Sequence, residues 1–289
     1  MSLPFSGSAR RLGQSCAMQK GNGSLCQTRG DLVVLKPEGL YCPQGDFYID
    51  PWLPVPHAVI THGHGDHARS GMGEYHCTRE SLSILRWRLG EQVYHTHADG
   101  EPFQLGRARV SLHPAGHVLG SAQVRIDVDG QVWVASGDYK RQPDPTCKPF
   151  EVVPCDTFIT EATFGLPVYR WPATADVAAD IAAWRRECAE RGEAAILYCY
   201  ALGKAQRVLA ELCAWEMQPA LLHGAVAAGV EVYRQAGIGM LETQPVSEHA
   251  RGADYAGQLV IAPPSAAGSA WIRRFRSAQQ GFASGDRKS

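Results

Sequence analysis

The chain has 289 residues, of which 45% are hydrophobic and 20% charged, so it can bury one large core or two modest ones and shows no sign of general disorder. Its formal net charge of -1 argues against a protein that coats nucleic acid through bulk electrostatics, although a local basic groove is compatible with it. The nine cysteines form no Cys-x-x-Cys pair, which predicts reduced core residues of a cytoplasmic protein. No apolar run reaches the roughly 18 residues of a membrane span, so we expect no membrane contact.

The first 30 residues differ in composition from the rest of the chain. They are rich in Ser and Gly and carry four cations, Arg10, Arg11, Lys20 and Arg29, without an acidic residue. They lack the apolar block of a secretory signal. We expect residues 1–30 to be a disordered or mis-started extension, and a targeting role is the alternative.

From Asp31 onward, short apolar runs separated by turn residues predict a β-rich layer. Asp129-Gly130 stands between the last two runs and predicts a tight hairpin, because such a turn needs positive φ angles. One helix is expected at 79–89, so the sheets should be covered by helices. The predicted strands are 32–35, 47–49, 58–61, 110–113, 122–128 and 132–136.

After Glu161 the pattern alternates between strands and helices. Thr174 can begin a helix that runs to about Arg191, and Gly192 can end it. This alternation predicts a parallel α/β unit of the βαβ type, and 164–172 is a candidate junction before it. The further strands are expected at 194–200, 220–223 and 259–262, and the further helices at 204–215, 226–235 and 267–276.

A dense group of polar residues follows the predicted strand at 58–61: His62-Gly63-His64-Gly65-Asp66-His67. A loop that leaves a rigid strand can direct several ligands to one point, and imidazole and carboxylate suit metals such as zinc. The spacing lets His62 and His64 converge on one ion while Asp66 and His67 turn toward a second. Glycines allow the backbone to curl between them.

Three further residues complete this prediction. His117 follows a predicted strand and supplies a third histidine for the first ion. Asp138, in Ser136-Gly137-Asp138, ends the next hairpin and can bridge both ions. Asp50, at the end of the strand at 47–49, is placed to hydrogen-bond a ligand histidine or a bound water. Taken alone, His117 and Asp138 are also compatible with packing and turn roles.

Other histidines are not expected to be ligands. The segment His95-Thr96-His97-Ala98-Asp99 repeats part of the spacing but lacks the last histidine, and we expect a solvated loop. His249 is expected in a surface loop. Four lone histidines near strands are expected to be packing residues with satisfied hydrogen bonds: His57, His76, His113 and His223.

The motifs resemble a known superfamily. His62 to His67, Ala115 to Ala122 and Ser136 to Tyr139 are similar to the metallo-β-lactamase superfamily. Thr160-Glu161-Ala162-Thr163-Phe164-Gly165 and Ala201-Leu202-Gly203-Lys204-Ala205-Gln206 resemble its β-CASP branch of nucleases. Together with the segments at 32–43 and 262–271, they look most like the bacterial ligase-associated DNA exonuclease family, often labelled a putative mRNA 3'-end processing factor.

The resemblance implies an α/β protein in which residues 31–165 form a metallo-β-lactamase αββα sandwich and residues 166–289 a β-CASP-like parallel α/β lid. It implies a phosphodiesterase that binds two zinc ions, with Mn²⁺ or Mg²⁺ as alternatives. Glu161 matches the family's acidic motif and is given a catalytic role with Asp66 and Asp50. Lys204, at a predicted helix start, can meet a backbone phosphate, and a solvated lysine is the alternative.

The sequence also departs from the family. Its members continue into an Asp-His motif and a Thr-His-Gly strand, so the resemblance implies a C-terminally truncated lid and a weakened second metal site. The leading expectation is an exonuclease on single-stranded DNA in repair, with a DNA ligase or helicase as partner. The alternatives are an RNA-processing nuclease, an inactive nucleic-acid-binding relative, and a hydrolase of thioesters or lactams.

Overall fold

The computed structural model describes residues 30–162, 174–215, 218–250 and 253–283. Contacts divide the chain into residues 1–30 and residues 31–289, and only the second unit is described below. The expected extension, apart from Gly30, and the expected domain boundary after residue 165 lie outside the described residues. In the described part of the chain, no helix combines the length and the apolar character needed to cross a bilayer.

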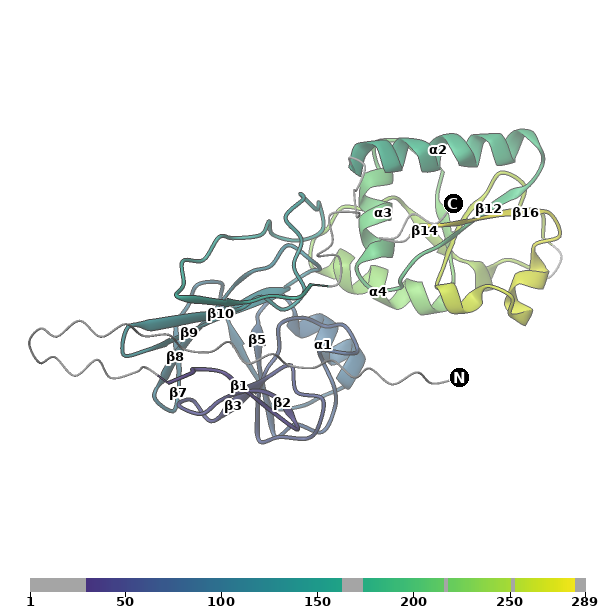
Figure 1. The fold of residues 1–289 in the computed structure, drawn as a ribbon. Coiled ribbons are helices and arrows are strands. Elements are labelled where there is room, and N and C mark those ends of the chain that lie inside the picture. The colour runs from purple at the N-terminus through teal and green to yellow at the C-terminus, as the bar shows by residue number, and fades with distance from the viewer. Residues whose placement is uncertain (1–29, 163–173, 216–217, 251–252, 284–289) are drawn as a thin grey trace, which may run out of the picture. The chain divides into compact units, whose positions relative to one another are not determined.

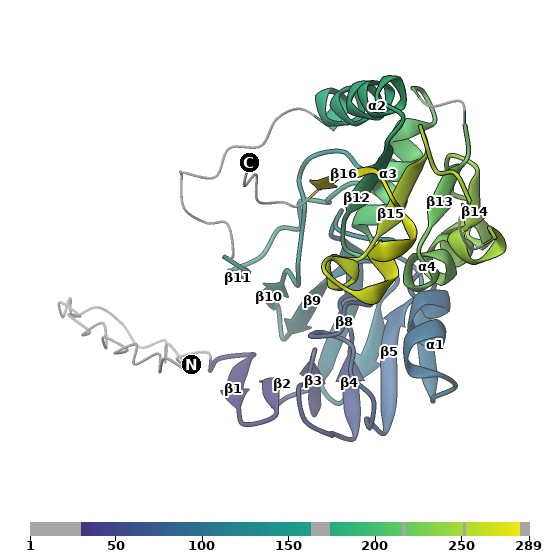
Figure 2. The ribbon, with the colours of Figure 1, turned by 90° about the vertical axis from the view of Figure 1, so that its right-hand side faces the viewer.

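The first sheet has six strands, which lie side by side in chain order from β1 to β6. Figure 2 labels the first five of them, β1 to β5. β1–β2 and β2–β3 pair antiparallel, whereas β3, β4, β5 and β6 run parallel. Helix α1 (Leu82–Leu89) packs Leu85 against Tyr75 and Cys77 on one face. The strands are β1 (Val34–Lys36), β2 (Gly39–Cys42), β3 (Phe47–Ile49), β4 (His57–Val59), β5 (Glu74–Thr78) and β6 (Tyr94–His97).

The second sheet has the order β11–β10–β9–β8–β7, and all its pairs are antiparallel except β10 with β11. Asp129 and Gly130 connect β9 to β10 with φ angles of 51° and 78°, as the hairpin prediction requires. The strands are β7 (Phe103–Leu105), β8 (Ala108–Pro114), β9 (Ala122–Val128), β10 (Gln131–Ala135) and β11 (Thr157–Ile159).

The two sheets share one core. Phe47 and Ile49 of the first sheet pack in the same cluster as Leu112 and Ile126 of the second, and all four are at most 2% exposed. Successive side chains of a strand point to opposite faces of its sheet. The apolar residues of each sheet therefore lie on the face that packs against the other sheet. The result is the two-sheet sandwich expected for a metallo-β-lactamase fold.

The third sheet is fully parallel, in the order β14–β13–β15–β12–β16 (Figure 1). Helix α2 (Thr174–Glu190) precedes β12, α3 (Lys204–Leu212) connects β12 to β13, and α4 (Gly224–Gln235) connects β13 to β14. Every residue of β12 and β15 is buried, because both sheet faces are covered. The predicted parallel α/β unit is therefore confirmed. The strands are β12 (Ala194–Tyr198), β13 (Ala220–Leu222), β14 (Thr243–Pro245), β15 (Leu259–Ala262) and β16 (Ala278–Phe282).

One helix prediction is wrong. Residues 267–276 contain only the short 3-10 helix Ala270–Arg274, preceded by a second one at Pro264–Ala266. Gly268 takes a φ of 68° between them, so the chain leaves helical geometry there. Ser269 then caps the second turn by accepting the Trp271 N–H. The composition of residues 267–276 is compatible with a helix, but the positive φ of Gly268 interrupts the helical backbone.

A small cluster connects the sandwich to the third-sheet region within the described unit. Ile84 and Leu119 pack with Leu202 and Tyr233. The Tyr233 hydroxyl accepts a hydrogen bond of 3.1 Å from the Leu119 N–H, and Tyr233 is fully buried. Burial also raises the pKa of its phenol, so the hydroxyl stays neutral.

We predict that Tyr233→Phe lowers the free energy of unfolding by about 1–3 kcal/mol, because it leaves the buried Leu119 N–H without an acceptor while the ring still fills its site. Urea unfolding measures the change. Tyr255→Phe is the matched control, since the hydroxyl of this buried tyrosine makes no hydrogen bond with any described residue. Equal losses for the two variants would contradict the prediction.

Candidate metal centre

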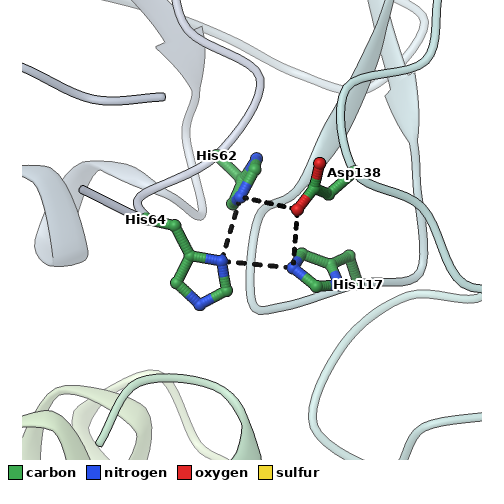
Figure 3. A group of neighbouring side chains, drawn as sticks. All are labelled: His62, His64, His117 and Asp138. Atoms are coloured by element: carbon green, nitrogen blue, oxygen red, sulfur yellow. Dashed lines mark hydrogen bonds and ion pairs between the residues drawn. The ribbon is translucent and has the colours of Figure 1, made fainter. Parts of the chain in front are cut away.

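The candidate ligands all follow the carboxyl ends of strands. His62 and His64 come after β4, His117 after β8 and Asp138 after β10. Strand β4 belongs to the first sheet, and β8 and β10 belong to the second, so loops of both sheets meet at one edge of the sandwich. Figure 3 shows the four side chains pointing toward a common point.

The distances suit one metal ion. His64 Nδ1 lies 3.0 Å from His62 Nε2 and 3.2 Å from His117 Nε2. Asp138 Oδ2 lies 3.9 Å from His62 Nε2 and 3.6 Å from His117 Nε2. Ligands at about 2.0–2.1 Å from a tetrahedral zinc ion are separated by about 3.3 Å. The three nitrogens and one oxygen therefore match a His₃Asp site.

The hydrogen bonds of Thr61 fix the tautomer of His62. The Thr61 hydroxyl donates its one proton to Asp50 Oδ2 at 2.6 Å, so it can only accept from His62 Nδ1 at 3.0 Å. His62 Nε2 then directs a lone pair into the centre. Burial keeps the pKa of His62, which is 0% exposed, well below its ordinary value, so this ring stays neutral.

His64 is fixed in the same way by a carbonyl group. Its Nε2 lies 3.2 Å from the Leu202 oxygen and must donate to it, which leaves a lone pair on Nδ1. Burial lowers the pKa of His64 and that of His117, the latter to about 4. Two lone pairs facing each other at 3.0 Å repel unless a cation lies between them. The donor set therefore fits a metal ion.

The second half of the motif has a different electrostatic character. His67 Nε2 lies 3.3 Å from Asp138 Oδ1 and 3.8 Å from Asp66 Oδ2. Burial alone would lower the pKa of His67, but hydrogen bonds to Asp138 and Asp50 raise it to about 10. His67 therefore holds a proton toward Asp138, and a second cation would have to displace it. Asp138 offers one oxygen to each half of the centre.

Asp50 anchors this arrangement from behind. Its carboxylate accepts hydrogen bonds from the Thr61 N–H at 2.7 Å, the Thr61 hydroxyl at 2.6 Å and His67 Nδ1 at 2.7 Å. Asp50 follows β3 with a φ of 44°, a left-handed conformation that Asp tolerates better than most residues. Sequence reasoning placed Asp50 near a ligand histidine, and the structure places it beside His67.

The remaining predicted residues lie in two places. The Glu161 N–H bonds the Ser136 hydroxyl at 3.4 Å, so Glu161 follows β11 next to the turn that carries Asp138. Lys204 begins α3, two residues after the Leu202 carbonyl that binds His64. Burial lowers the pKa of Lys204, and Arg207 and Lys140 lower it further.

One prediction for the other histidines needs correction. The segment at 95–97 is not a solvated loop but part of strand β6, where His95 is half exposed and His97 is partly buried. His249 ends the short helix Val246–Glu248 and contacts Tyr255. His223 begins α4 and its Nδ1 accepts the Ala225 N–H, so it is a helix cap.

Three contributors were missed from the sequence. Thr61 precedes the motif directly, and a hydroxyl next to a ligand histidine was an available signal. Arg88 of α1 donates to the Gly63 carbonyl and so holds the loop between the first two histidines. The Leu202 carbonyl has no sequence signal, because a backbone group is common to every residue.

We predict that Gly137→Ala weakens metal binding and destabilises the protein. Gly137 has a φ of 54°, and a Cβ there would lie 2.6 Å from Thr61, whose hydroxyl is committed to Asp50 and His62. Displacing Thr61 should cost about 10–100-fold in metal affinity, as loss of a supporting hydrogen bond does. Zinc titration measures this.

The control is Gly130→Ala, which has a similar φ of 78° but no atom within 4 Å of the added methyl. It should show only the backbone strain of about 1–2 kcal/mol in the free energy of unfolding. Unchanged metal affinity in Gly137→Ala would rule out the supporting role of Thr61.

Comparison with known proteins adds to this geometry. No family model matches the chain. A protein named probable DNA ligase from Opitutus terrae is 32% identical over 240 residues, covering 82% of this chain and 23% of that protein. An RNase J-like protein from Methanocaldococcus jannaschii is 24% identical over 234 residues, covering 72% and 53%. Endoribonuclease ysh1 from Aspergillus fumigatus is 25% identical over 261 residues, covering 74% and 29%.

The chain thus spans between about a quarter and about half of the length of these relatives. The similarity to the Opitutus protein covers 240 residues, whereas residues 31–165 number only 135 (165 − 31 + 1), so it extends into the third-sheet region. The matched region takes in both the sandwich with its strand-end ligands and part of the third-sheet region, and over it the chain is similar to nucleases of the β-CASP branch of the metallo-β-lactamase superfamily.

Proposed function

We propose that the chain is a metal-dependent phosphodiesterase that degrades nucleic acid, with single-stranded DNA as the leading substrate and exonuclease action in repair as its role. The observation that carries this proposal is the convergence of His62, His64, His117 and Asp138 directly beside the start of α3. Residues 31–165 act as the catalytic domain and residues 166–289 as a lid. The names of the relatives, which include endoribonuclease and DNA ligase, support an action on nucleic acids.

The donor set favours zinc at the first position, since three imidazole nitrogens and one carboxylate are the ligands that zinc prefers. The second position, with Asp66, His67 and a shared Asp138, is richer in oxygen and also suits Mn²⁺ or Mg²⁺. Bound metal ions supply Lewis-acid charge that stabilises a scissile phosphate and acidifies water.

The protein's own residues hold and move protons around that chemistry. The Asp66 side chain is 76% exposed, so its carboxylate is open to a water or a substrate oxygen and can orient a nucleophile. Asp50 fixes His67 through Nδ1, which keeps the other ring nitrogen directed at Asp138. Glu161 follows β11 at the same sheet edge and is the candidate proton donor to the leaving oxygen.

Lys204 is the candidate phosphate ligand. It occupies the first turn of α3, where the helix dipole adds positive charge. The neighbouring cations are neutralised, since Asp144 pairs with Lys140 at 3.0 Å and with Arg207 at 3.5 Å. Lys204 makes no ion pair with the described acidic residues, so its charge is available to an anionic substrate.

RNA is the alternative substrate, because the printed names of two relatives include RNase J-like protein and endoribonuclease. The probable DNA ligase is the more identical relative and favours DNA, with a ligase or a helicase as the partner in repair. A phosphodiester is common to both nucleic acids, so discrimination depends on contacts to the sugar.

We predict that Lys204→Met weakens nucleic-acid binding uniformly across sequences and reduces the salt dependence of the logarithm of the binding constant by about 1, because one phosphate contact is lost. Fluorescence anisotropy at several salt concentrations measures both effects. Lys148→Met is the control, since the Lys148 amine is already paired with Asp99 and Glu80. Identical salt slopes in all three proteins would contradict the phosphate contact.

We predict that the zinc-loaded chain cleaves end-labelled single-stranded DNA faster than RNA of the same sequence, and that a chelator stops cleavage. Asp66→Ala should lower kcat/KM by at least about 100-fold, the lower end of what a general acid or base contributes. Asp180→Ala, on the exposed side of α2, should leave kcat/KM unchanged. Mononucleotide products released from one end would support exonuclease action.

The other outcomes separate the alternatives. Faster cleavage of RNA supports an RNA-processing nuclease. Binding of both nucleic acids without cleavage supports a non-catalytic relative, and cleavage of a thioester or a lactam alone would contradict the nuclease proposal.

A further inference from the structure

A second group of histidines lies on the first sheet. His57 begins β4, Glu74 and His76 lie in β5, and His95 lies in β6. The strand register pairs His57 with Glu74 and His76 with His95, so all four side chains share one face. Val59, two residues after His57, points from this face into the core between the sheets. A face that is apolar elsewhere is therefore polar at this corner.

The polar atoms of this group converge. Glu74 Oε1 lies 3.2 Å from His76 Nε2, and Glu74 Oε2 lies 3.2 Å from His95 Nε2. Both distances are close to the separation of about 3.3 Å between ligands of a tetrahedral zinc ion. One ligand atom from each of the three residues falls within 4.8 Å of the others. They form a His₂Glu donor set.

Neighbouring side chains orient two of these donors. His57 Nδ1 donates to the Glu74 carboxylate at 2.7 Å and so fixes the position of Glu74 Oε1. His76 is buried, with 8% of its side chain exposed, so its ring has little freedom to turn away from Glu74.

The outer nitrogen of His76 also has a partner. His76 Nδ1 lies 3.1 Å from His97 Nε2, and the His97 ring is stacked on Phe103 with centroids 3.5 Å apart. A carboxylate can only accept, so His76 Nε2 donates to Glu74 when no ion is bound, and Nδ1 accepts from His97 Nε2. A metal ion could take the place of the proton on Nε2, with Nδ1 then donating to His97.

We propose that Glu74, His76 and His95 bind a divalent transition metal ion, zinc being the best match to their chemistry, at a site separate from the strand-end centre. His57 positions Glu74, and His97 positions His76. The site is near the amino ends of β4 and β5, whereas the centre of His62 follows the carboxyl end of β4. Because β6 is the edge strand, a bound ion would tie this edge to β5 and stabilise the sheet.

This proposal does not depend on the hydrolytic activity. Its test is the number of zinc ions per chain, measured by atomic emission on the full chain after dialysis against sub-micromolar free zinc. We expect His95→Ala to hold one ion fewer than the wild type. The affinity for that ion should fall by more than about 100-fold, because loss of a residue that only supports a ligand costs at most about 100-fold. His57→Ala should reduce it about 10–100-fold.

His113→Ala is the matched control. His113 is also hydrogen-bonded to a glutamate, Glu151, at 3.0 Å, but it belongs to no converging group among the described residues. It should bind as much zinc as the wild type. The His95 side chain is 46% exposed, so its replacement should leave the fold intact, which the unchanged zinc content of the other centre and far-ultraviolet circular dichroism will report.

Cobalt substitution gives a second readout. Wild-type protein should show an absorption band of tetrahedral cobalt that diminishes in His95→Ala and in His95→Gln but not in His113→Ala. The zinc-dependent rise in Tm should diminish in the same two variants. Equal zinc content in the wild type and His95→Ala, or a third ion that binds only at high zinc concentration, would overturn the proposal and leave a hydrogen-bonded histidine network at this corner.

Discussion

The carboxylate of Asp50 is the constraint on which the centre depends. It takes the only proton of the Thr61 hydroxyl, and this forces His62 to donate through Nδ1 and to present a lone pair at Nε2. The same carboxylate holds His67 Nδ1, so one side chain sets the ring orientation in both halves of the motif. Its left-handed φ brings the carboxyl group back across the end of β4, toward the Thr61 N–H. Strain of this kind persists where surrounding hydrogen bonds over-determine it.

The two halves of the centre respond differently to a positive charge. His62 and His117 are neutral because burial penalises their protonated forms, so a proton is a poor substitute for a metal ion there. His67 is already protonated, because Asp50 and Asp138 flank its ring. An ion in the first half meets free lone pairs, whereas an ion in the second half must release a proton. The two halves of the centre thus differ in how their histidines are held: lone pairs face one another in the first, and carboxylates flank the ring in the second.

The sequence predicted those parts whose residue types are dictated by chemistry or periodicity. The cluster from His62 to His67 stood out because few other roles require so many ligands, and the fully apolar β12 and β15 could only be buried strands. Prediction failed where backbone pairing decides the structure. Strands β5 and β6 carry the polar residues Glu74, His76 and His95 on one face, so they contain few of the apolar residues by which buried strands are recognised. The contribution of Leu202 comes from a carbonyl group, which no side chain reveals.

That carbonyl has a thermodynamic consequence. Leu202 lies between β12 and α3 of the third-sheet region, yet its oxygen fixes the proton of His64 and thereby the lone pair that faces the centre. Metal affinity and the position of this loop are therefore linked quantities, and the linkage is reciprocal. A nucleic acid strand that displaced the loop would weaken ion binding by the same factor by which the ion opposes the displacement. The loop that carries Leu202 is in this sense part of the coordination chemistry of the centre.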